Sequence, residues 1–415
     1  MQAPRWLPAA AAVAVAAWGA NQFTALATVY RARTDWSALA LAAMFSVYLL
    51  GLAPGLLLAG PAADRFGRRR TVRAGLALSA AASLLLATGH EGAGYASRLA
   101  TGFAAGLVFL AGATWMRELS TAPPQVSSRR AMYATGTGFA AGALASGVLA
   151  EWLPDPMTVP ALAHAAACLL VLRATRDVPD TAAVRPPPSS HVEAHRAAVT
   201  HPRFRFVVLP AAPAVLGAAT VAYVVLPPLV ADRTPGYAPL FGGLVAALTL
   251  TAGVVAQPFA ARLDDAHSAR ATLGAMAVVI AGLLVGALAA ARDSVALVVV
   301  AAVVLGTGYG LTLGAGLHEV ERLHCGPSSA SLYQTTVSGG FLTPLLLTGT
   351  ADHASYPALL VAMAVIGLLC LGVTAAHSRR HLPEPPKRED ASVQSTPAQA
   401  TQATPTARSH HRWAE

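Results

Sequence analysis

The residues best suited to chemistry lie between positions 60 and 70, where the chain reads Gly-Pro-Ala-Ala-Asp-Arg-Phe-Gly-Arg-Arg-Arg. Glycine at positions 60 and 67 permits a tight turn and a close approach of neighbouring backbone. The carboxylate of Asp64 can accept hydrogen bonds from the N-terminus of a neighbouring helix, where the helix dipole favours an anion. Glu118, further along the chain, can pair with one of the arginines. We therefore predict a charged turn at a helix end, in which the glycines shape the backbone and the charged side chains form ion pairs. Its residues are Gly60, Asp64, Arg65, Gly67, Arg68, Arg69 and Glu118.

Two titratable side chains lie inside apolar stretches and are candidates for coupling to protons. Arg98 begins the pattern Arg98-x-x-x-Gly102-x-x-x-Gly106, and a cation several residues into an apolar helix is costly enough to suggest a function. The alternative is a long side chain that reaches back to the polar interface. His164 can titrate near neutral pH, although a lone histidine in such a stretch is more often packed and hydrogen-bonded. We retain both residues as candidates.

Patterns typical of enzymes are missing from the sequence. The stretch at His318 lacks the second histidine that a zinc-protease helix requires four residues later, because that position is Arg322. The glycines from Gly306 to Gly310 have no strand before them and do not indicate nucleotide binding. The three cysteines form no disulfide or metal-binding pattern. We therefore expect no enzymatic activity, no metal and no cofactor.

The elements that must position these residues are apolar helices. Hydrophobic residues make up 55% of the 415-residue chain and charged residues 12%, about half the charged share of soluble domains. Apolar stretches of about 20 residues recur, the length that crosses a hydrocarbon layer about 30 Å thick, and continuous stretches of this kind are helices in lipid. We predict an all-α membrane protein with twelve transmembrane helices, near 7–30, 36–60, 71–89, 93–116, 131–153, 157–172, 206–231, 240–261, 271–291, 294–317, 327–350 and 356–376.

The distribution of arginine predicts the orientation of these helices. With the N-terminus in the cytoplasm, most of the 29 Lys and Arg residues fall in cytoplasmic segments, as positively charged loops do. Both termini are then cytoplasmic, in a multi-pass protein of the cytoplasmic (inner) cell membrane. The formal net charge of +9 does not indicate a nucleic-acid partner, because the charge is spread over short segments between apolar stretches.

The twelve helices divide into two pseudo-symmetric bundles of six. A polar connection from about Arg173 to Arg205 separates them. The glycines of the fourth helix, Gly102, Gly106 and Gly112, recur at one constant offset in the tenth helix as Gly306, Gly310 and Gly316, which suggests internal duplication. We predict a first bundle at 1–173, a cytoplasmic loop at 174–205, a second bundle at 206–376 and a disordered cytoplasmic tail at 377–415, which is rich in Pro, Ser, Thr and Gln.

The run from Gly60 to Arg70 closely resembles the signature Gly-x-Leu-Ala-Asp-Arg-x-Gly-Arg-Arg/Lys of the major facilitator superfamily, with Ala62 at the leucine position. The resemblance extends to the twelve spans, the central loop and the repeat. It implies that the run, Asp64 and Arg68 above all, latches the two halves together when the cavity faces outward. Arg98 resembles an arginine tied to proton movement in some exporters. The stretch from Gly138 to Gly142 departs from the exporter signature Gly-Pro-x-x-Gly because it lacks the proline.

The resemblance also implies a central cavity between the halves, lined mainly by helices one, four, seven and ten. The polar and aromatic candidates for substrate contact are Asn21, Gln22, Tyr223, Tyr309 and, on helix eleven, Gln334. Because so little charge is available to such a cavity, we expect a neutral or amphipathic solute.

The predicted function is secondary active transport of a small solute by alternating access, in a protein whose arginine-rich, alanine-rich composition suggests a bacterial source. One form is proton-coupled efflux of a drug-like compound or secondary metabolite. Import or uniport of a small neutral metabolite is the first alternative, and a non-transporting sensor or receptor is the second. The expected partners are the solute, the lipid bilayer and protons, and the chain is expected to act as a monomer.

Overall fold

In the computed structural model the twelve apolar stretches are helical, and the predicted all-α fold is confirmed. The structure describes residues 4–181, 199–323, 327–380 and 382. Ten of the stretches form single helices in this part of the chain. They are α1 (Leu7–Arg33), α2 (Ala38–Phe66), α3 (Arg68–Leu86), α4 (Glu91–Glu118), α5 (Pro124–Trp152), α6 (Val159–Ala174), α10 (Ala238–Leu263), α11 (Arg270–Arg292), α12 (Val295–Glu321) and α15 (Tyr356–His377).

The seventh and eleventh stretches are interrupted helices. The seventh consists of a π-helical turn η1 (Phe204–Val208), α8 (Leu209–Thr220), a second π-helical turn η2 (Val221–Val225) and α9 (Leu226–Leu229), followed by a short 3₁₀ turn η3 (Ala231–Arg233). The eleventh consists of α13 (Pro327–Ser338), a 3₁₀ turn η4 (Gly339–Leu342) and α14 (Thr343–Thr350). Proline within α8 and at the start of α14, and the pair Gly339–Gly340, account for these breaks because neither residue type supports a regular helix.

Not every helix is apolar enough to identify alone. Within the described residues, eight helices, with Phe204–Leu229 taken as one, are long and apolar enough by themselves to cross a membrane. The arginines at the start of α3 and the hydroxyl residues of α5 lower their mean hydropathy, and α6 has only 16 residues. These helices are therefore recognised as spans by their place in the bundle.

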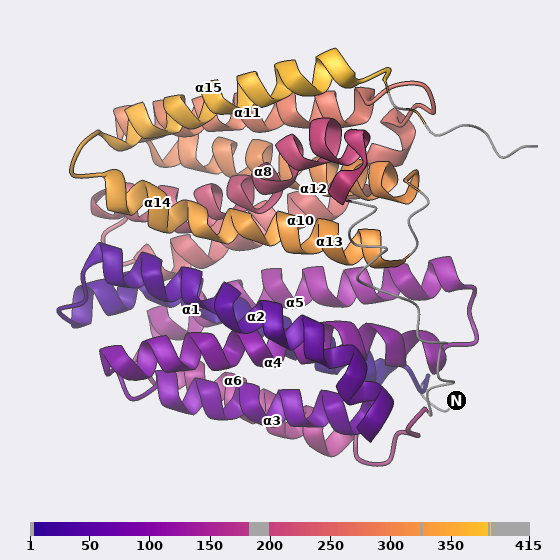
Figure 1. The fold of residues 1–415 in the computed structure, drawn as a ribbon. Coiled ribbons are helices and arrows are strands. Elements are labelled where there is room, and N and C mark those ends of the chain that lie inside the picture. The colour runs from indigo at the N-terminus through magenta and orange to yellow at the C-terminus, as the bar shows by residue number, and fades with distance from the viewer. Residues whose placement is uncertain (1–3, 182–198, 324–326, 381, 383–415) are drawn as a thin grey trace, which may run out of the picture. The chain divides into compact units, whose positions relative to one another are not determined.

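The helices form two groups, with α1–α6 in one and the remaining helices in the other (Figure 1). We call these groups the first half and the second half. Equivalent glycines hold equivalent pairs of helices together. A Cβ on Gly106 of α4 would meet the α2 backbone at Gly55, and a Cβ on Gly310 of α12 would meet the α10 backbone at Gly253. Small residues permit this close packing of membrane helices.

The third glycine of the repeat differs between the halves. A Cβ on Gly112 would meet the side chain of Val13 on α1, whereas a Cβ on Gly316 would meet the ring of Tyr333 on α13. Two of the three repeated glycines, the first and the second, therefore pack against the backbone of the equivalent helix in each half, and the third does not. The domain boundaries at 173/174, 205/206 and 376/377 stay predictions, and residues 182–198 and 383–415 of the predicted loop and tail lie outside the described residues.

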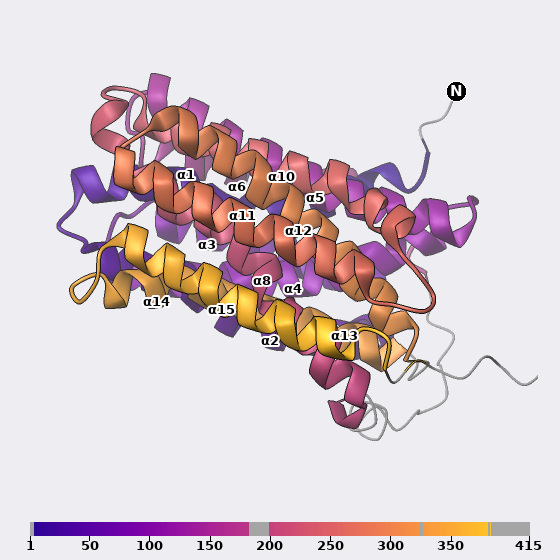
Figure 2. The ribbon, with the colours of Figure 1, turned by 90° about the horizontal axis from the view of Figure 1, so that it is seen from above.

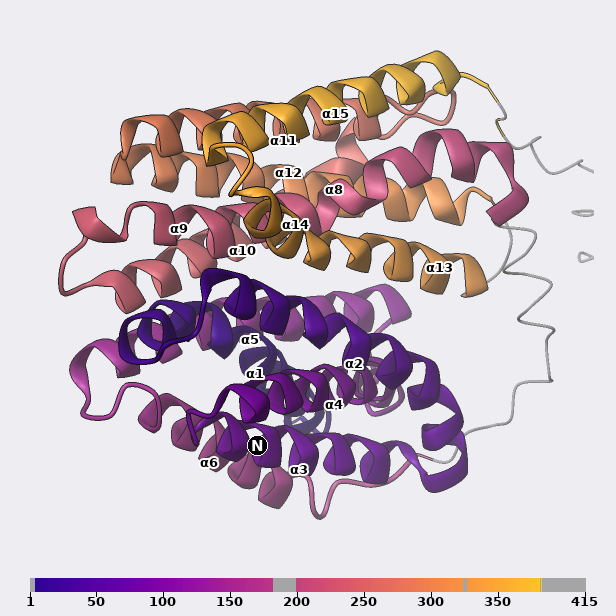
Figure 3. The ribbon, with the colours of Figure 1, turned by 60° about the vertical axis from the view of Figure 1, so that its left-hand side comes forward.

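The halves meet mainly along α5 and α10, where Gly147 packs against Pro239 and Gly243. The view in Figure 2 places α10, α11, α12 and α15 across one face of the second half. We call the end at which α2 joins α3 the arginine-rich end, and the end at which α1 joins α2 the opposite end. Toward the arginine-rich end α2 and α13 diverge, whereas α2 packs on α14 and η4 (Figure 3).

Candidate functional site

The charged run between α2 and α3 forms a compact network. Arg68 donates to Asp64 at 2.7 Å, one helical turn earlier, and lies 3.5 Å from Glu118 at the end of α4. Gly67 joins the two helices with a φ of +93°, which a residue with a Cβ adopts only with strain. Arg68 therefore links Asp64, near the end of α2, to Glu118 at the end of α4, and the role of these residues as a latch stays a prediction.

A short segment of the chain after α6, residues 176–181, covers this network. The carboxylate of Asp180 accepts a hydrogen bond from the backbone N–H of Arg69 at 3.0 Å and so caps the N-terminus of α3. Arg69 donates to the carbonyl oxygens of Arg176 and Val178, and Thr181 donates to Glu118. The sequence analysis missed Asp180, because nothing in its spacing to the run at 60–70 indicates contact.

Three details of the sequence prediction are corrected here. Asp64 bonds to the side chain of Arg68 instead of to the N-terminus of a neighbouring helix, and Asp180 takes that position. A Cβ on Gly60 would meet nothing, so this glycine does not serve a close approach. Arg65 lies over the ring of Phe66, with 5.5 Å between the guanidinium carbon and the ring centre. In the described part of the chain, the hydrogen bonds and ion pairs of this network join only the first half and residues 176–181.

A second charged network lies at the arginine-rich end of the second half. Arg203 and Glu319 form a two-pronged ion pair at 2.6 and 3.0 Å, and their side chains are only 0% and 2% exposed. Arg322 links Glu319, at 3.2 Å, to Asp264 at the end of α10, at 2.5 Å. Arg203 also donates to the carbonyl oxygens of Ser378 and Arg380 after α15. This network joins the ends of four helical segments of the second half, as the network at α2–α3 joins helix ends in the first half. The sequence did not predict it.

The turn between α10 and α11 is held by a carboxylate next to this network. Asp265 accepts hydrogen bonds from the hydroxyl of Ser268 at 2.8 Å and from the backbone N–H of His267 at 3.1 Å. These bonds lower the pKa of Asp265 from its ordinary value, because they favour the charged form. The turn therefore keeps its anion in mildly acidic solution.

His164 is fully buried within the first half, and its hydrogen bonds define its tautomer. Its Nε2 lies 3.0 Å from the carbonyl oxygen of Val15, which can only accept, so Nε2 carries the proton. Its Nδ1 then accepts from the hydroxyl of Ser83 at 2.7 Å, and Ser83 accepts from Gln22 at 2.8 Å. This arrangement describes a neutral, satisfied histidine, and the coupling role of His164 stays a prediction.

Arg98 is buried in the interior and does not reach the interface. Its side chain is 1% exposed, which removes the alternative of a side chain extending to the polar boundary. The guanidinium lies between two rings, 5.0 Å from the centre of Phe23 and 4.9 Å from that of Tyr48, and donates to the carbonyl oxygen of Ala20 at 3.2 Å. No ion pair joins it to a carboxylate in the described part of the chain.

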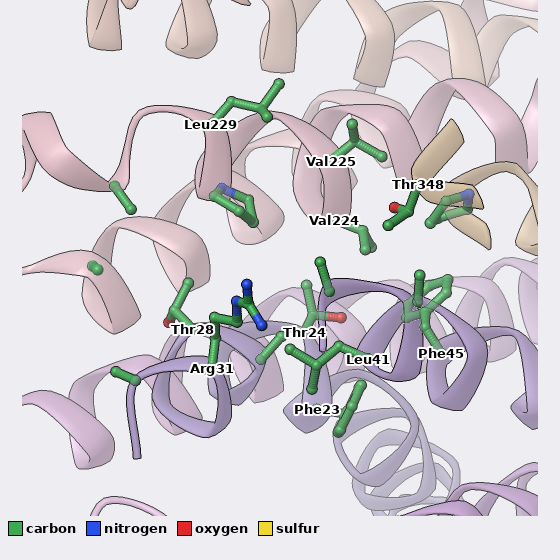
Figure 4. Close-up of a pocket in the computed structure, with 18 of the residues that line it drawn as sticks. Phe23, Thr24, Thr28, Arg31, Leu41, Phe45, Val224, Val225, Leu229 and Thr348 are labelled. Atoms are coloured by element: carbon green, nitrogen blue, oxygen red, sulfur yellow. The ribbon is translucent and has the colours of Figure 1, made fainter. Parts of the chain in front are cut away.

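A cavity of about 460 Å³ lies between the halves, toward the opposite end (Figure 4). Side chains of α1 and α2 face those of η2, α9 and α14 across it. Its wall is mostly apolar, with threonine hydroxyls from both halves and one arginine. The lining includes Phe23, Thr24, Thr28, Arg31, Leu41, Ala42, Phe45, Val224, Val225, Leu229, Thr348 and Tyr356.

None of the five predicted cavity residues lines this cavity. Asn21 donates to the carbonyl oxygen of Phe139 and accepts from Thr24, and Gln22 turns into the first half toward Ser83. Tyr223 packs on Phe45, with 6.5 Å between ring centres. Of the four helices expected to line the cavity, one and seven do so, but through other residues. The fourth and tenth, α4 and α12, contribute nothing to this wall, and α2 and α14 take their place.

The remaining two predicted residues lie elsewhere. Tyr309 packs against Gly253 of α10, where a Cβ would meet its ring, and Gln334 is exposed on α13. Neither belongs to the wall in this conformation. Their role as substrate contacts stays a prediction, together with that of Tyr223.

Comparison with known proteins shows which proteins share this fold. Residues 9–318 match the family described as Major Facilitator Superfamily. Among solved structures, a variant of the nucleoside transporter NupG has a TM-score of 0.73 at 12% identity, covering 89% of this chain and 98% of that one. A D-xylose-proton symporter has a TM-score of 0.64 at 15% identity, covering 91% and 97%.

A third similar structure is a POT family transporter in complex with 5-aminolevulinic acid, with a TM-score of 0.73 at 11% identity over 91% of this chain and 96% of that one. No curated protein matches the sequence. At these identities the solved structures establish a common fold, and the substrates in their names belong to those proteins.

Proposed function

The chain belongs to the major facilitator superfamily and is a multi-pass secondary transporter of a small solute, not an enzyme; from this premise we propose that it expels an amphipathic, drug-like or secondary-metabolite compound in exchange for protons. The observation that carries the proposal is the cavity between the halves. Its wall is apolar with scattered hydroxyl groups, which suits a solute with a large apolar surface and few polar groups. Efflux and proton exchange follow from the resemblance of Arg98 and its glycines to the motif of proton-linked exporters.

We further propose that the two halves rock about this cavity. The cavity lies toward the opposite end, and α2 and α13 diverge at the arginine-rich end. Asp64, Arg68 and Glu118 would then exchange partners as that end closes against the second half. This alternating exposure needs no chemical change in the solute.

The proposed orientation places the arginine-rich end in the cytoplasm. Both termini then lie on the inner side of the cytoplasmic membrane, in agreement with the preference of cytoplasmic segments for arginine. We also propose that the protein acts as a monomer. The alternative to proton-coupled efflux is uptake or uniport of a small neutral metabolite. Imposing a pH gradient of either sign on proteoliposomes separates the two, since a proton exchanger accumulates solute only in the compartment with more protons and a uniporter ignores the gradient.

The cavity itself is tested by filling it. Ala42 is buried in the wall, and Ala42→Trp should lower the flux of a neutral lipophilic solute such as 4-phenylbutyramide at least about tenfold, because the indole occupies the space that the solute needs. Leu57→Trp is the matched control on the same helix, because Leu57 is 74% exposed and does not line the cavity. Flux is measured in proteoliposomes of equal protein content. Equal rates for both variants would refute the cavity as the route.

The proposed latch is tested by a pair of carboxylates with different contacts. Asp64→Asn should slow transport several-fold with little change in thermal stability, since one exposed ion pair contributes about 0–1 kcal/mol. Asp180→Ala should instead lower the free energy of unfolding by about 1 kcal/mol, because the N-terminus of α3 loses its cap. Flux and thermal unfolding are measured for both variants. Unaltered flux in Asp64→Asn would exclude the latch.

A further inference from the structure

The buried cation of Arg98 has no counter-charge among the residues that the structure describes. Its guanidinium is enclosed by rings and by the backbone of α1, and its Nε has no hydrogen-bond partner in the described part of the chain. Burying a charge without a carboxylate is costly, and a buried donor without an acceptor adds to that cost. Such groups are rare in native proteins, and one explanation for them is a bound molecule or ion that completes their hydrogen bonds.

A second unpaired donor lies beside the first. The hydroxyl of Tyr48, whose ring packs on the Arg98 guanidinium, is also buried and has no partner among the described residues. Tyr48 contacts the second half through the ring of Phe341, with 5.4 Å between ring centres. The two donors therefore lie at the interface between the halves.

This pair of donors lies directly behind the wall of the cavity. The ring of Phe23 contacts the Arg98 guanidinium and also lines the cavity. On the other side, Phe45 lines the cavity and packs against both Tyr223 and Phe341. One layer of aromatic rings thus separates an apolar chamber from a positive charge with two free donors.

We propose that Arg98 and Tyr48 bind the carboxylate of an amphipathic monoanion whose apolar body occupies the cavity. The inference rests on the proposed transport function and narrows its substrate class. Two donors and one positive charge match the acceptor oxygens and the single charge of a carboxylate. The mostly apolar wall favours an apolar body of the solute, and the ring of Phe23 would have to turn aside for the carboxylate to reach Arg98.

The test compares a carboxylate with its neutral isostere. The purified full-length protein in lipid nanodiscs is titrated with 4-phenylbutyrate and with 4-phenylbutyramide in chloride-free buffer. The wild-type protein should bind the carboxylate at least about tenfold more tightly, the difference expected for one charge-assisted hydrogen bond. Arg98→Gln should abolish this preference. Tyr48→Phe, which removes only the hydroxyl, should reduce it and serves where Arg98→Gln does not fold.

The control and the contrary outcomes are equally defined. Arg33→Gln, at an exposed position on α1, should leave the preference unchanged. Equal binding of the two ligands to the wild type, or a preference that survives in both variants, overturns the proposal. So does a response to sodium chloride alone that equals the response to the carboxylate, because the site would then be one for inorganic anions.

Measuring the flux of both compounds into proteoliposomes tests the proposed transport function separately from the proposed carboxylate site. Movement of 4-phenylbutyramide into proteoliposomes without any carboxylate preference would leave the proposed transport intact and refute the role of Arg98. An Arg98-dependent carboxylate preference without flux of either compound would support the site and count against transport of this solute class.

Discussion

Glu319→Gln should lower the free energy of unfolding by about 3–5 kcal/mol, the largest loss that we expect from a single substitution in this protein. The glutamine keeps the size of the side chain and removes its charge. Arg203, which is fully buried, would lose its two-pronged partner, and Arg322 would lose one of its two carboxylates. A buried cation left without compensation costs much more than the ion pair contributed when intact. Unfolding by heat and by denaturant in a single detergent measures the effect.

The neighbouring acid supplies the matched control. Glu321 lies two residues further on the same helix and is 73% exposed, so Glu321→Gln should change the stability by less than about 0.5 kcal/mol. The double substitution Arg203→Met with Glu319→Leu should recover most of the loss, because two apolar side chains of similar volume replace both charges. If Glu319→Gln were as stable as Glu321→Gln, the buried pair would not hold the helix ends together.

Gly310→Val should lower the free energy of unfolding by about 3 kcal/mol. Its Cβ would enter the backbone of α10 at Gly253, where no side-chain rotation can relieve the clash, so α10 and α12 would have to separate. Gly106→Val should have a similar effect in the first half, since its Cβ would meet the backbone of α2 near Gly55. The same thermal and denaturant unfolding measurements apply.

A glycine on a neighbouring helix shows whether the effect is one of packing. A Cβ on Gly274 of α11 would meet nothing, so Gly274→Val should leave the stability unchanged or raise it slightly. A large loss in this variant would show that valine destabilises these helices even where no neighbouring backbone lies close, and the approach of helices would then not explain the loss in Gly310→Val. A small loss in Gly310→Val would contradict the packing that the two halves share.

The two networks at the arginine-rich end show how far sequence reasoning reached. A contact between Glu118 and one of the arginines could be suggested from the sequence, because they lie at the ends of apolar stretches on the same side of the membrane. The cap from Asp180 and the pair Arg203–Glu319 could not. Their partners are separated by more than a hundred residues, and only packing brings them together.

The cavity shows a second limit of prediction from sequence, because the rotation of each helix about its own axis decides which residues line it. Helices one and seven were expected to form it, and they do, but the wall uses Thr24 and Thr28 where the sequence suggested Asn21 and Gln22. In water, the polar face of a helix shows which side points outward. The helices of this chain are apolar on most sides, so composition alone does not show which face is turned toward the other half.

The sequence by itself determined the solvent, the number of helices and the repeat. In lipid the backbone N–H and C=O groups must bond to one another, so continuous apolar stretches of about 20 residues form transmembrane helices. Glycine at regular spacing indicates where such helices pack closely. Tertiary structure alone decided that Arg98 is enclosed without a carboxylate, that His164 is a satisfied neutral side chain and that Asp180 caps α3. These properties depend on the rotation and depth of each helix against its neighbours. That geometry is set by the packing of all the helices together and by no single stretch of the chain.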